Sequence, residues 1–135
     1  MATPTSNARL KELLGSLEHA VMQDLWDQGS ATVSSVHKRL NESRGANEAL
    51  AYTTVMTVLV RLTDKGWLSR SKPGRGYQYT PRYSDEELLE HMSGAEVAQL
   101  VARYGDAALV HFAGALEHAD PDLLEMVIAM VEADE

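Results

Sequence analysis

Residues 51–66 read AYTTVMTVLVRLTDKG, and residues 67–80 continue as WLSRSKPGRGYQYT. The first segment predicts an amphipathic helix over residues 53–65, with one buried stripe and one outer face. Gly66 is expected to end this helix in the left-handed conformation that glycine adopts readily. The buried stripe follows the i, i+3, i+4, i+7 spacing of a helix: Val55, Val58, Leu59 and Leu62.

The outer face of this helix has a composition that is unusual for a solvated surface. Thr54, Thr57 and Arg61 run along it, and Met56 lies near its edge. The face therefore carries one charge, short hydroxyl groups and apolar atoms. In the major groove of DNA, threonine contacts thymine methyls and base edges, while arginine forks onto guanine. The face suits that groove, although most amphipathic helices simply contribute to a core.

The second segment predicts a β-hairpin. Residues 67–72 and 77–80 are its strands, and residues 73–76 (PGRG) are a turn whose glycines are expected to supply positive φ. A basic hairpin alone is usually a solvated surface. Directly after a recognition helix, it predicts a winged helix-turn-helix, a fold that usually binds DNA. The hairpin has three cations and no acid among them: Arg70, Lys72 and Arg75.

The residues before this segment predict two more helices and a short strand. Residues 1–15 are a polar lead-in that we expect to be partly disordered. Ser16 is expected to cap a first helix and Thr32 a second. Residues 50–52 are expected to form a short strand that pairs with the hairpin, and Thr53 to cap the recognition helix. Helix, helix, strand, helix and wing follow in the order that a winged helix requires.

The second helix has an apolar inner face and a polar outer one. His37, Lys38 and Arg39 are expected to face outward, opposite the valines of the inner face. Residues 41–49 read NESRGANEA, which has no hydrophobic periodicity and predicts a polar loop before the recognition helix.

After Pro81 the composition changes, and three further helices are predicted. Ser84 and Glu87 form a capping box at the start of the first, Gly105 ends it, and Asp120 caps the last. These helices carry more apolar surface than they can cover among themselves, and such a surface marks a partner interface. Packing on the winged helix of the same chain is the alternative. We expect a homodimer, because a single recognition helix rarely gives a specific repressor enough contacts.

The chain is expected to divide into two domains of opposite charge. Residues 1–83 form a winged-helix domain with eleven Lys and Arg against seven Asp and Glu, a net charge of +4. Residues 84–135 form a helical dimerisation domain with one Arg against thirteen acids, a net charge of −12, so that the chain totals −8. A basic front and an acidic back suit DNA binding by the first domain. The residues expected at the dimer interface are Leu109, Phe112, Leu116, Leu124, Val127, Ile128 and Val131.

The sequence offers little for catalysis or metal binding. It contains no cysteine, which excludes disulfides, thiolate metal sites and cysteine nucleophiles. Its five histidines never pair at i+3 or i+4 spacing. His111 and His118 lie two helical turns apart, and a weak metal site there is the alternative to ordinary surface histidines. No phosphate-binding loop or nucleophile elbow is present, so we expect no enzyme, no cofactor and no metal.

No apolar run reaches the ~18 residues of a membrane span, and the N-terminus lacks the cationic and apolar regions of a signal peptide. We therefore expect a soluble, cytoplasmic protein without membrane insertion.

Several stretches match the pattern of one family: AYTTVMTVLVRL (51–62), GRGYQYTP (74–81) and, earlier, LEHAVM (17–22). Through them the chain resembles the BlaI/MecI family of penicillinase repressors, from about Gly15 to the last helix. The resemblance implies a homodimeric winged-helix repressor that binds palindromic promoter DNA and dimerises through its C-terminal helices. It implies that DNA is contacted by Tyr52, Thr53, Thr54, Met56, Thr57 and Arg61 and, in the wing, by Arg75.

The chain departs from this family pattern where some members are inactivated. In antibiotic-responsive members, a membrane-bound sensor protease acts as the inducing partner by cleaving an Asn-Phe bond in the dimerisation region. The matching position here is His111-Phe112, which lacks the asparagine. Copper-responsive relatives carry a C-terminal cysteine cluster, which this chain also lacks. The resemblance thus implies a DNA-binding mechanism but no particular signal.

The expected function is that of a transcriptional repressor occupying an operator that overlaps a promoter. Helix 53–65 would lie in the major groove and the basic wing on the DNA backbone. The alternative is a winged-helix protein-interaction module, in which the hairpin and the outer face bind protein. The net charge of +4 in residues 1–83 and the threonine and arginine face favour DNA.

Overall fold

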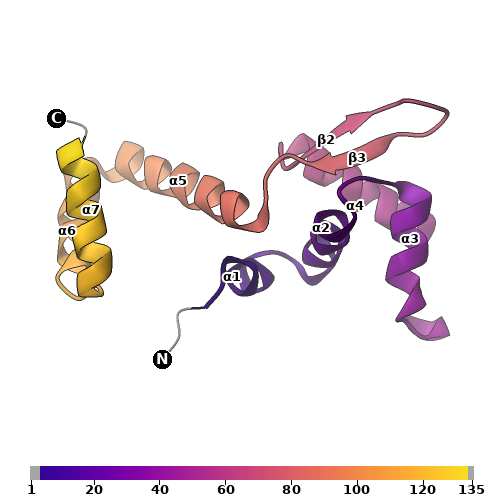
Figure 1. Ribbon diagram of the computed structural model, residues 1–135, viewed down its shortest axis with the longest axis horizontal. Helices are drawn as coiled ribbons and strands as arrows, with labels where there is room; N and C mark the ends of the chain where they lie inside the picture. The colour runs from indigo at the N-terminus through magenta and orange to yellow at the C-terminus, as the bar shows by residue number, and fades with distance from the viewer. Residues whose placement is uncertain (1–3, 134–135) are drawn as a thin grey trace. The chain divides into compact units, whose positions relative to one another are not determined.

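The computed structural model describes residues 4–133, and Figure 1 shows the order of their helices and strands. The chain divides into two compact units, Met1–His91 and Met92–Glu135. The elements are α1 (Ser6–Leu13), α2 (Ser16–Gln28), β1 (Ala31–Thr32), α3 (Val33–Glu42), the 3-10 turn η1 (Ala46–Glu48), α4 (Tyr52–Asp64), β2 (Leu68–Ser71), β3 (Gln78–Pro81), α5 (Asp85–Tyr104), α6 (Asp106–Leu116) and α7 (Pro121–Ala133).

The core of the first unit lies where α2, α3 and α4 pack against one another and against the sheet. The predicted apolar stripe of α4 is confirmed, since Val55, Leu59 and Leu62 are fully buried and Val58 is 5% exposed. Each buried side chain of this size stabilises the fold by about 1.5–3 kcal/mol. The other fully or almost fully buried large side chains of the unit are Leu10, Val21, Met22, Leu25, Val36, Leu68, Tyr79 and Leu88.

The sheet has three antiparallel strands in the order β1-β3-β2. The predicted hairpin is confirmed as β2 and β3, with Leu68 opposite Pro81. The prediction that residues 50–52 form the third strand is wrong, because β1 (Ala31–Thr32) holds that position beside β3. The backbone groups of Leu50 are instead bonded to side chains of α3. The fold is a winged helix, as predicted.

Part of the expected lead-in is a helix, α1. Its cap is Thr5, whose side chain accepts a hydrogen bond of 3.1 Å from the amide of Ala8. Leu10 is fully buried and Leu14 is 6% exposed, and α1 packs on α2. The expectation of disorder is therefore wrong for residues 6–13, because these two leucines suffice to dock a short polar helix. Residues 1–3 lie outside the described residues.

Of three predicted caps before the wing, one is confirmed. Thr32 accepts a hydrogen bond of 3.2 Å from the amide of Ser35 at the start of α3. α2 begins at Ser16 itself and has no side-chain cap. α4 begins at Tyr52, so Thr53 lies inside its first turn rather than before it. The two predictions are wrong because Gly15 and Ala51 occupy the non-helical cap positions of α2 and α4.

Positive φ occurs at helix ends rather than in the wing. Gly66 has a φ of 84°, which confirms the predicted left-handed end of α4. Among the described residues, Gly74 and Gly76 do not have positive φ, so that prediction is wrong. Residues 72–77 form a loop longer than a tight hairpin turn, and such a loop can reverse the chain without a left-handed residue.

The outer face of α3 makes more contacts than predicted. Arg39 forms a bidentate pair with Asp24 of α2, with Nε–Oδ1 and Nη2–Oδ2 distances of 2.8 and 2.9 Å. The hydrogen bond with Asp24 raises the pKa of Arg39. His37 is half-buried and contacts the loop before α4. Only Lys38 is exposed as expected, because neighbouring elements extend over the rest of this face.

The start of α5 belongs to the first unit. The Ser84–Glu87 capping box is confirmed: the Ser84 amide donates to Glu87 Oε1 (3.0 Å), and the Glu87 amide donates to Ser84 Oγ (3.1 Å). Leu88 is fully buried, and the Trp26 indole donates a hydrogen bond of 2.9 Å to the carbonyl oxygen of Tyr83. These contacts anchor the first turns of α5 to α2.

The second unit contains the rest of α5, then α6 and α7. Gly105, with a φ of 60°, separates α5 from α6, and Asp120 Oδ1 accepts a hydrogen bond of 2.8 Å from the Asp122 amide at the start of α7. α7 has no buried residue, although it is rich in apolar side chains. Within residues 4–133, no helix combines the length and the apolar character needed to cross a membrane.

Candidate nucleic-acid interface

The outer face of α4 is open to solvent. Tyr52 is 45% exposed and Met56 39% exposed. Thr53, Thr54, Thr57 and Arg61 are exposed as well. The structure thus places six of the seven predicted DNA-contacting residues on α4. The seventh, Arg75, is exposed on the loop between β2 and β3.

One hydroxyl of this face has a fixed orientation. The Thr57 hydroxyl donates a hydrogen bond of 2.8 Å to the carbonyl oxygen of Thr53, one turn earlier in the helix. The proton of this hydroxyl is therefore used in a hydrogen bond within the helix. The Thr57 side chain is exposed, and its oxygen can still accept a hydrogen bond, as from a base amino group.

A shallow hollow lies where α4 faces the beginning of α2. It is open to solvent and has a volume of about 320 Å³. Arg61 and three threonines of α4 form one wall, and Leu17 of α2 contributes to the other. A row of hydroxyls with one cation beside a concave surface can hold a DNA backbone or a base edge. The lining residues are Leu17, Thr53, Thr54, Thr57, Val58 and Arg61.

The wing carries a cation–π cluster that we did not predict. The Arg70 guanidinium lies 4.4 Å, and the Lys72 ammonium 5.3 Å, from the centroid of the Tyr77 ring. Both cations therefore lie over the same aromatic ring, whose face attracts positive charge. The sequence pattern did not indicate this cluster, because Lys72 and Tyr77 lie in the loop between β2 and β3, whose conformation brings them together. Figure 1 shows the wing extending beyond the helices of its unit.

The cations of the interface have no acidic partner in the described part of the chain. The ion pairs among residues 4–133 are Arg39–Asp24 and Lys65–Glu18, and both are structural pairs between helices. Arg61, Arg70, Lys72 and Arg75 therefore remain available to an anionic ligand. Within the same residues, no group of histidines and acids is placed to hold a metal ion.

The second unit presents an apolar surface of its own. Leu109, Ile128 and Val131 are 53%, 48% and 62% exposed. The other four residues predicted at a dimer interface are half-buried: Phe112, Leu116, Leu124 and Val127.

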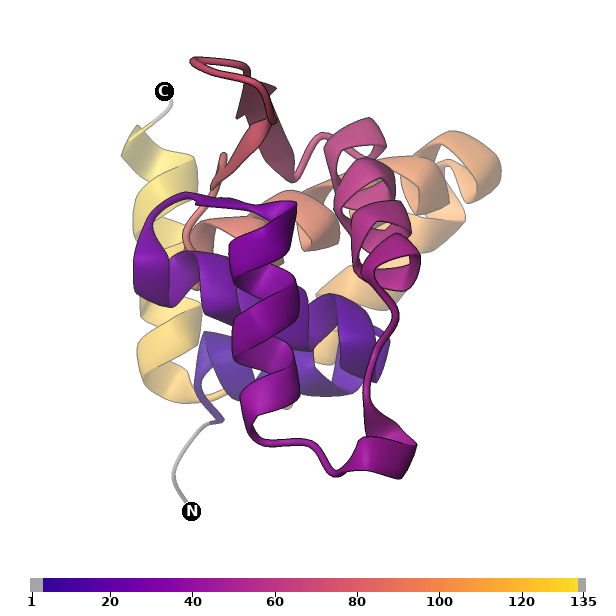
Figure 2. The same cartoon turned by 90° about the vertical axis from the view of Figure 1, so that its right-hand side faces the viewer.

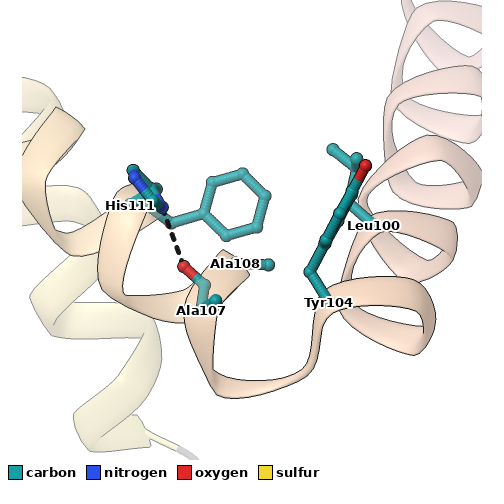
Figure 3. Close-up of a pocket in the computed structure, with 6 residues that line it drawn as sticks. Leu100, Tyr104, Ala107, Ala108 and His111 are labelled. Atoms are coloured by element: carbon teal, nitrogen blue, oxygen red, sulfur yellow. Dashed lines mark hydrogen bonds between the residues drawn. The ribbon is translucent and has the colours of Figure 1, made fainter.

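An apolar pocket of about 320 Å³ lies between α5 and α6, and Figure 3 shows the residues that line it. Leu100 and Tyr104 of α5 form one side, and Ala108, His111 and Phe112 of α6 the other. His111 Nδ1 lies 2.9 Å from the carbonyl oxygen of Ala107, so it carries the proton of that bond. The rest of the lining is hydrocarbon, which suits an apolar side chain.

The chain is similar to the known members of one protein family. Residues 14–133 match the penicillinase repressor family. A transcriptional regulator BlaI of Mycobacterium tuberculosis is 36% identical over 121 residues, which cover 89% of this chain and 86% of that protein. The penicillinase repressor of Bacillus licheniformis is 30% identical over 77 residues, 57% of each chain. The solution structure of the DNA-binding domain of the repressor BlaI is 30% identical, covers 55% of this chain and 85% of that one, and has a TM-score of 0.48.

Proposed function

Because this chain belongs to the penicillinase repressor family, we propose that it is a transcriptional repressor that binds double-stranded operator DNA. It would act in the cytoplasm, with α4 in the major groove and the wing on the phosphate backbone. Tyr52, Thr53, Thr54, Met56, Thr57 and Arg61 would contact the bases and nearby phosphates, and Arg75 the backbone.

This proposal rests on which charged side chains form ion pairs and which do not. The two ion pairs of the described residues hold helices together, while every cation of the recognition face and the wing lacks an acidic partner there. Four such cations on a recognition helix and its wing supply the phosphate contacts that dominate affinity for DNA. The acidic residues of the chain are concentrated beyond residue 83, away from this surface in sequence.

We also propose that the repressor acts as a homodimer through α6 and α7. A helix that is rich in apolar residues and has none of them buried in its own chain fits a surface completed by a second copy. A symmetric dimer presents two recognition helices to the two halves of a palindromic operator. The interface would include Leu109, Phe112, Leu116, Leu124, Val127, Ile128 and Val131.

The competing function is a winged-helix module that binds protein. An acidic peptide would be attracted by the same cations, but it would not use the threonines and Met56 to read a base sequence. Fluorescence anisotropy separates the two, with the full chain titrated against the DNA upstream of its own gene and against a scrambled duplex. We expect preference for the upstream DNA, by at least about a thousandfold at moderate salt. Equal binding to both duplexes would reject a sequence-specific repressor.

A further inference from the structure

We infer that His37 and Asn41 of α3 are positioning residues that determine operator specificity without touching DNA. They hold the start of the recognition helix from outside the DNA surface. The inference rests on the proposed function and adds residues that the family resemblance did not indicate. Figure 2 shows the arrangement, in which α3 and α4 are separate helices joined by the loop that contains η1.

Asn41 holds the backbone of Leu50 at both of its polar groups. The Leu50 amide donates a hydrogen bond of 2.8 Å to Asn41 Oδ1, and Asn41 Nδ2 donates one of 3.1 Å to the Leu50 carbonyl oxygen. The carboxamide thus takes the place of a strand partner. Its orientation is fixed by chemistry, because the flipped amide would face donor with donor and acceptor with acceptor.

His37 also contacts the Leu50 carbonyl oxygen, and in addition it contacts the recognition helix. Its Nε2 lies 2.8 Å from the Leu50 carbonyl oxygen. Its ring meets the Tyr52 ring edge to face, with centroids 5.8 Å apart and planes at 73°. Because a carbonyl oxygen only accepts, Nε2 carries the proton of this bond. The neutral Nε2–H form and the imidazolium both donate from that atom, so the contact does not depend on the charge of the ring.

The start of α4 has few other constraints. Its cap residue, Ala51, makes no side-chain cap bond, and alanine is a poor cap. Residues 51–54 are all exposed, and the first buried side chain of the helix is Val55. The connection from α3 is long for a helix-turn-helix, and no residue of η1 is buried. The contacts of Leu50 with α3 are therefore what fixes the first turn.

The first turn of α4 is also where specificity is expected to reside. Tyr52, Thr53 and Thr54 lie there, and only Ala51 separates them from Leu50, which α3 holds. If Leu50 is released, these side chains sample more positions, and contacts to base edges lose their geometry. Phosphate contacts from the wing are less demanding and remain. The loss should therefore fall on operator DNA and spare random DNA.

The test compares three variants of the full chain. Asn41→Ala removes both bonds from Asn41, and His37→Phe keeps an aromatic ring against Tyr52 while removing one donor. Asn47→Ala is the matched control, because Asn47 is an exposed asparagine of the same connection. Affinity is measured for operator and for scrambled DNA, and hydrogen exchange of the Leu50 amide by NMR.

We expect Asn41→Ala to weaken operator binding roughly tenfold, the discrimination that one good base contact supplies, with random DNA changed less than about twofold. Leu50 amide exchange should accelerate in step, and Asn47→Ala should match the native chain in all three measurements. His37→Phe should lower the logarithm of operator affinity by about half as much as Asn41→Ala does. If Asn41→Ala does not fold, His37→Phe alone tests the inference. Equal losses on both DNAs, or fast Leu50 exchange with unchanged operator affinity, would overturn the inference. A native chain with no operator preference would instead reject the proposed function.

Discussion

The guanidinium of Arg70, on β2, lies 4.4 Å from the centroid of the Tyr77 ring, in the loop between β2 and β3. The same ring accepts Lys72 at 5.3 Å, and neither cation meets a carboxylate among residues 4–133. The ring therefore contacts two positive charges of the wing. The phosphates of a DNA backbone are an anionic ligand that two such cations could bind together.

Replacing Tyr77 with leucine should weaken binding to DNA of any sequence. Each cation–π contact at an exposed site stabilises by about 0.5–1 kcal/mol, so the loss should be about two- to fivefold for each contact that organises DNA binding. Tyr77→Phe keeps the ring face and should bind like the native chain. Anisotropy titrations on operator and scrambled duplexes provide the measurement. Identical affinities for Tyr77→Leu and Tyr77→Phe would show that the ring does not organise the cations.

Arg75→Ala should make DNA binding less sensitive to salt. One lost phosphate contact lowers the slope of log affinity against log salt concentration by about 0.9, on any DNA sequence. The slope is measured by titrating a duplex at several salt concentrations. Lys38→Ala, which removes an exposed cation from α3, is the control and should leave the slope unchanged. If the slope of Arg75→Ala equals that of the native chain, the wing tip does not reach the backbone.

Arg61→Ala and Thr57→Ala should each cost about 1–3 kcal/mol of operator affinity, because their side chains would contact bases. Binding to random DNA should fall less. Thr57→Ser tests the methyl group separately, since it keeps a hydroxyl that can donate to the Thr53 carbonyl as the native one does. Competition titrations against random DNA give the specificity ratio. Losses of equal size on both DNAs would mean that these residues do not read sequence.

The capping box of α5 should make stability depend on pH. The hydrogen bonds with Ser84, that from its backbone amide first, lower the pKa of Glu87. A group whose pKa is lower in the folded state contributes stability above its unfolded pKa and loses it as the pH falls through the folded value. Glu87→Ala should therefore be less stable than the native chain near about pH 7 and nearly equal to it near about pH 3, in urea unfolding. A difference of the same size at both pH values would contradict the assignment.

Hydrophobic periodicity predicted the recognition helix, because Val55, Leu59 and Leu62 repeat at helical spacing and are all buried. The turn residues 73–76 predicted the wing. Periodicity could not predict β1, since Ala31 and Thr32 are too few residues to show an alternation. α1 was missed for a related reason: its burial depends on Leu10 and Leu14 in an otherwise polar segment.

The side chains that position the site were beyond the reach of pattern analysis. Helical spacing placed His37 on an outer face, and only the path of residues 43–51 brings Leu50 back against it. The Tyr77 cluster likewise requires the conformation of the loop between β2 and β3. Exposed residues of α4 were predictable because a one-helix pattern defines them, whereas contacts between elements depend on loop conformations that local sequence does not specify.

The central claim is that two copies of the chain, joined through α6 and α7, bind one operator. Ile128 is 48% exposed in the single chain, so Ile128→Asp should leave each protomer folded while placing an unpaired charge in the dimer interface. Val127→Asp acts on the same surface, and Glu125→Gln is the control outside the predicted interface. Far-UV circular dichroism confirms that the variants fold.

The decisive measurement is sedimentation velocity of the native chain and Ile128→Asp, each alone and with a duplex that carries the operator. The native chain should sediment as a dimer, and two copies should bind each duplex. Ile128→Asp should sediment as a folded monomer and lose most of its operator affinity, because one half-site offers few contacts. A monomeric variant that retains full operator affinity would contradict the claim that dimerisation is how this repressor recognises its site.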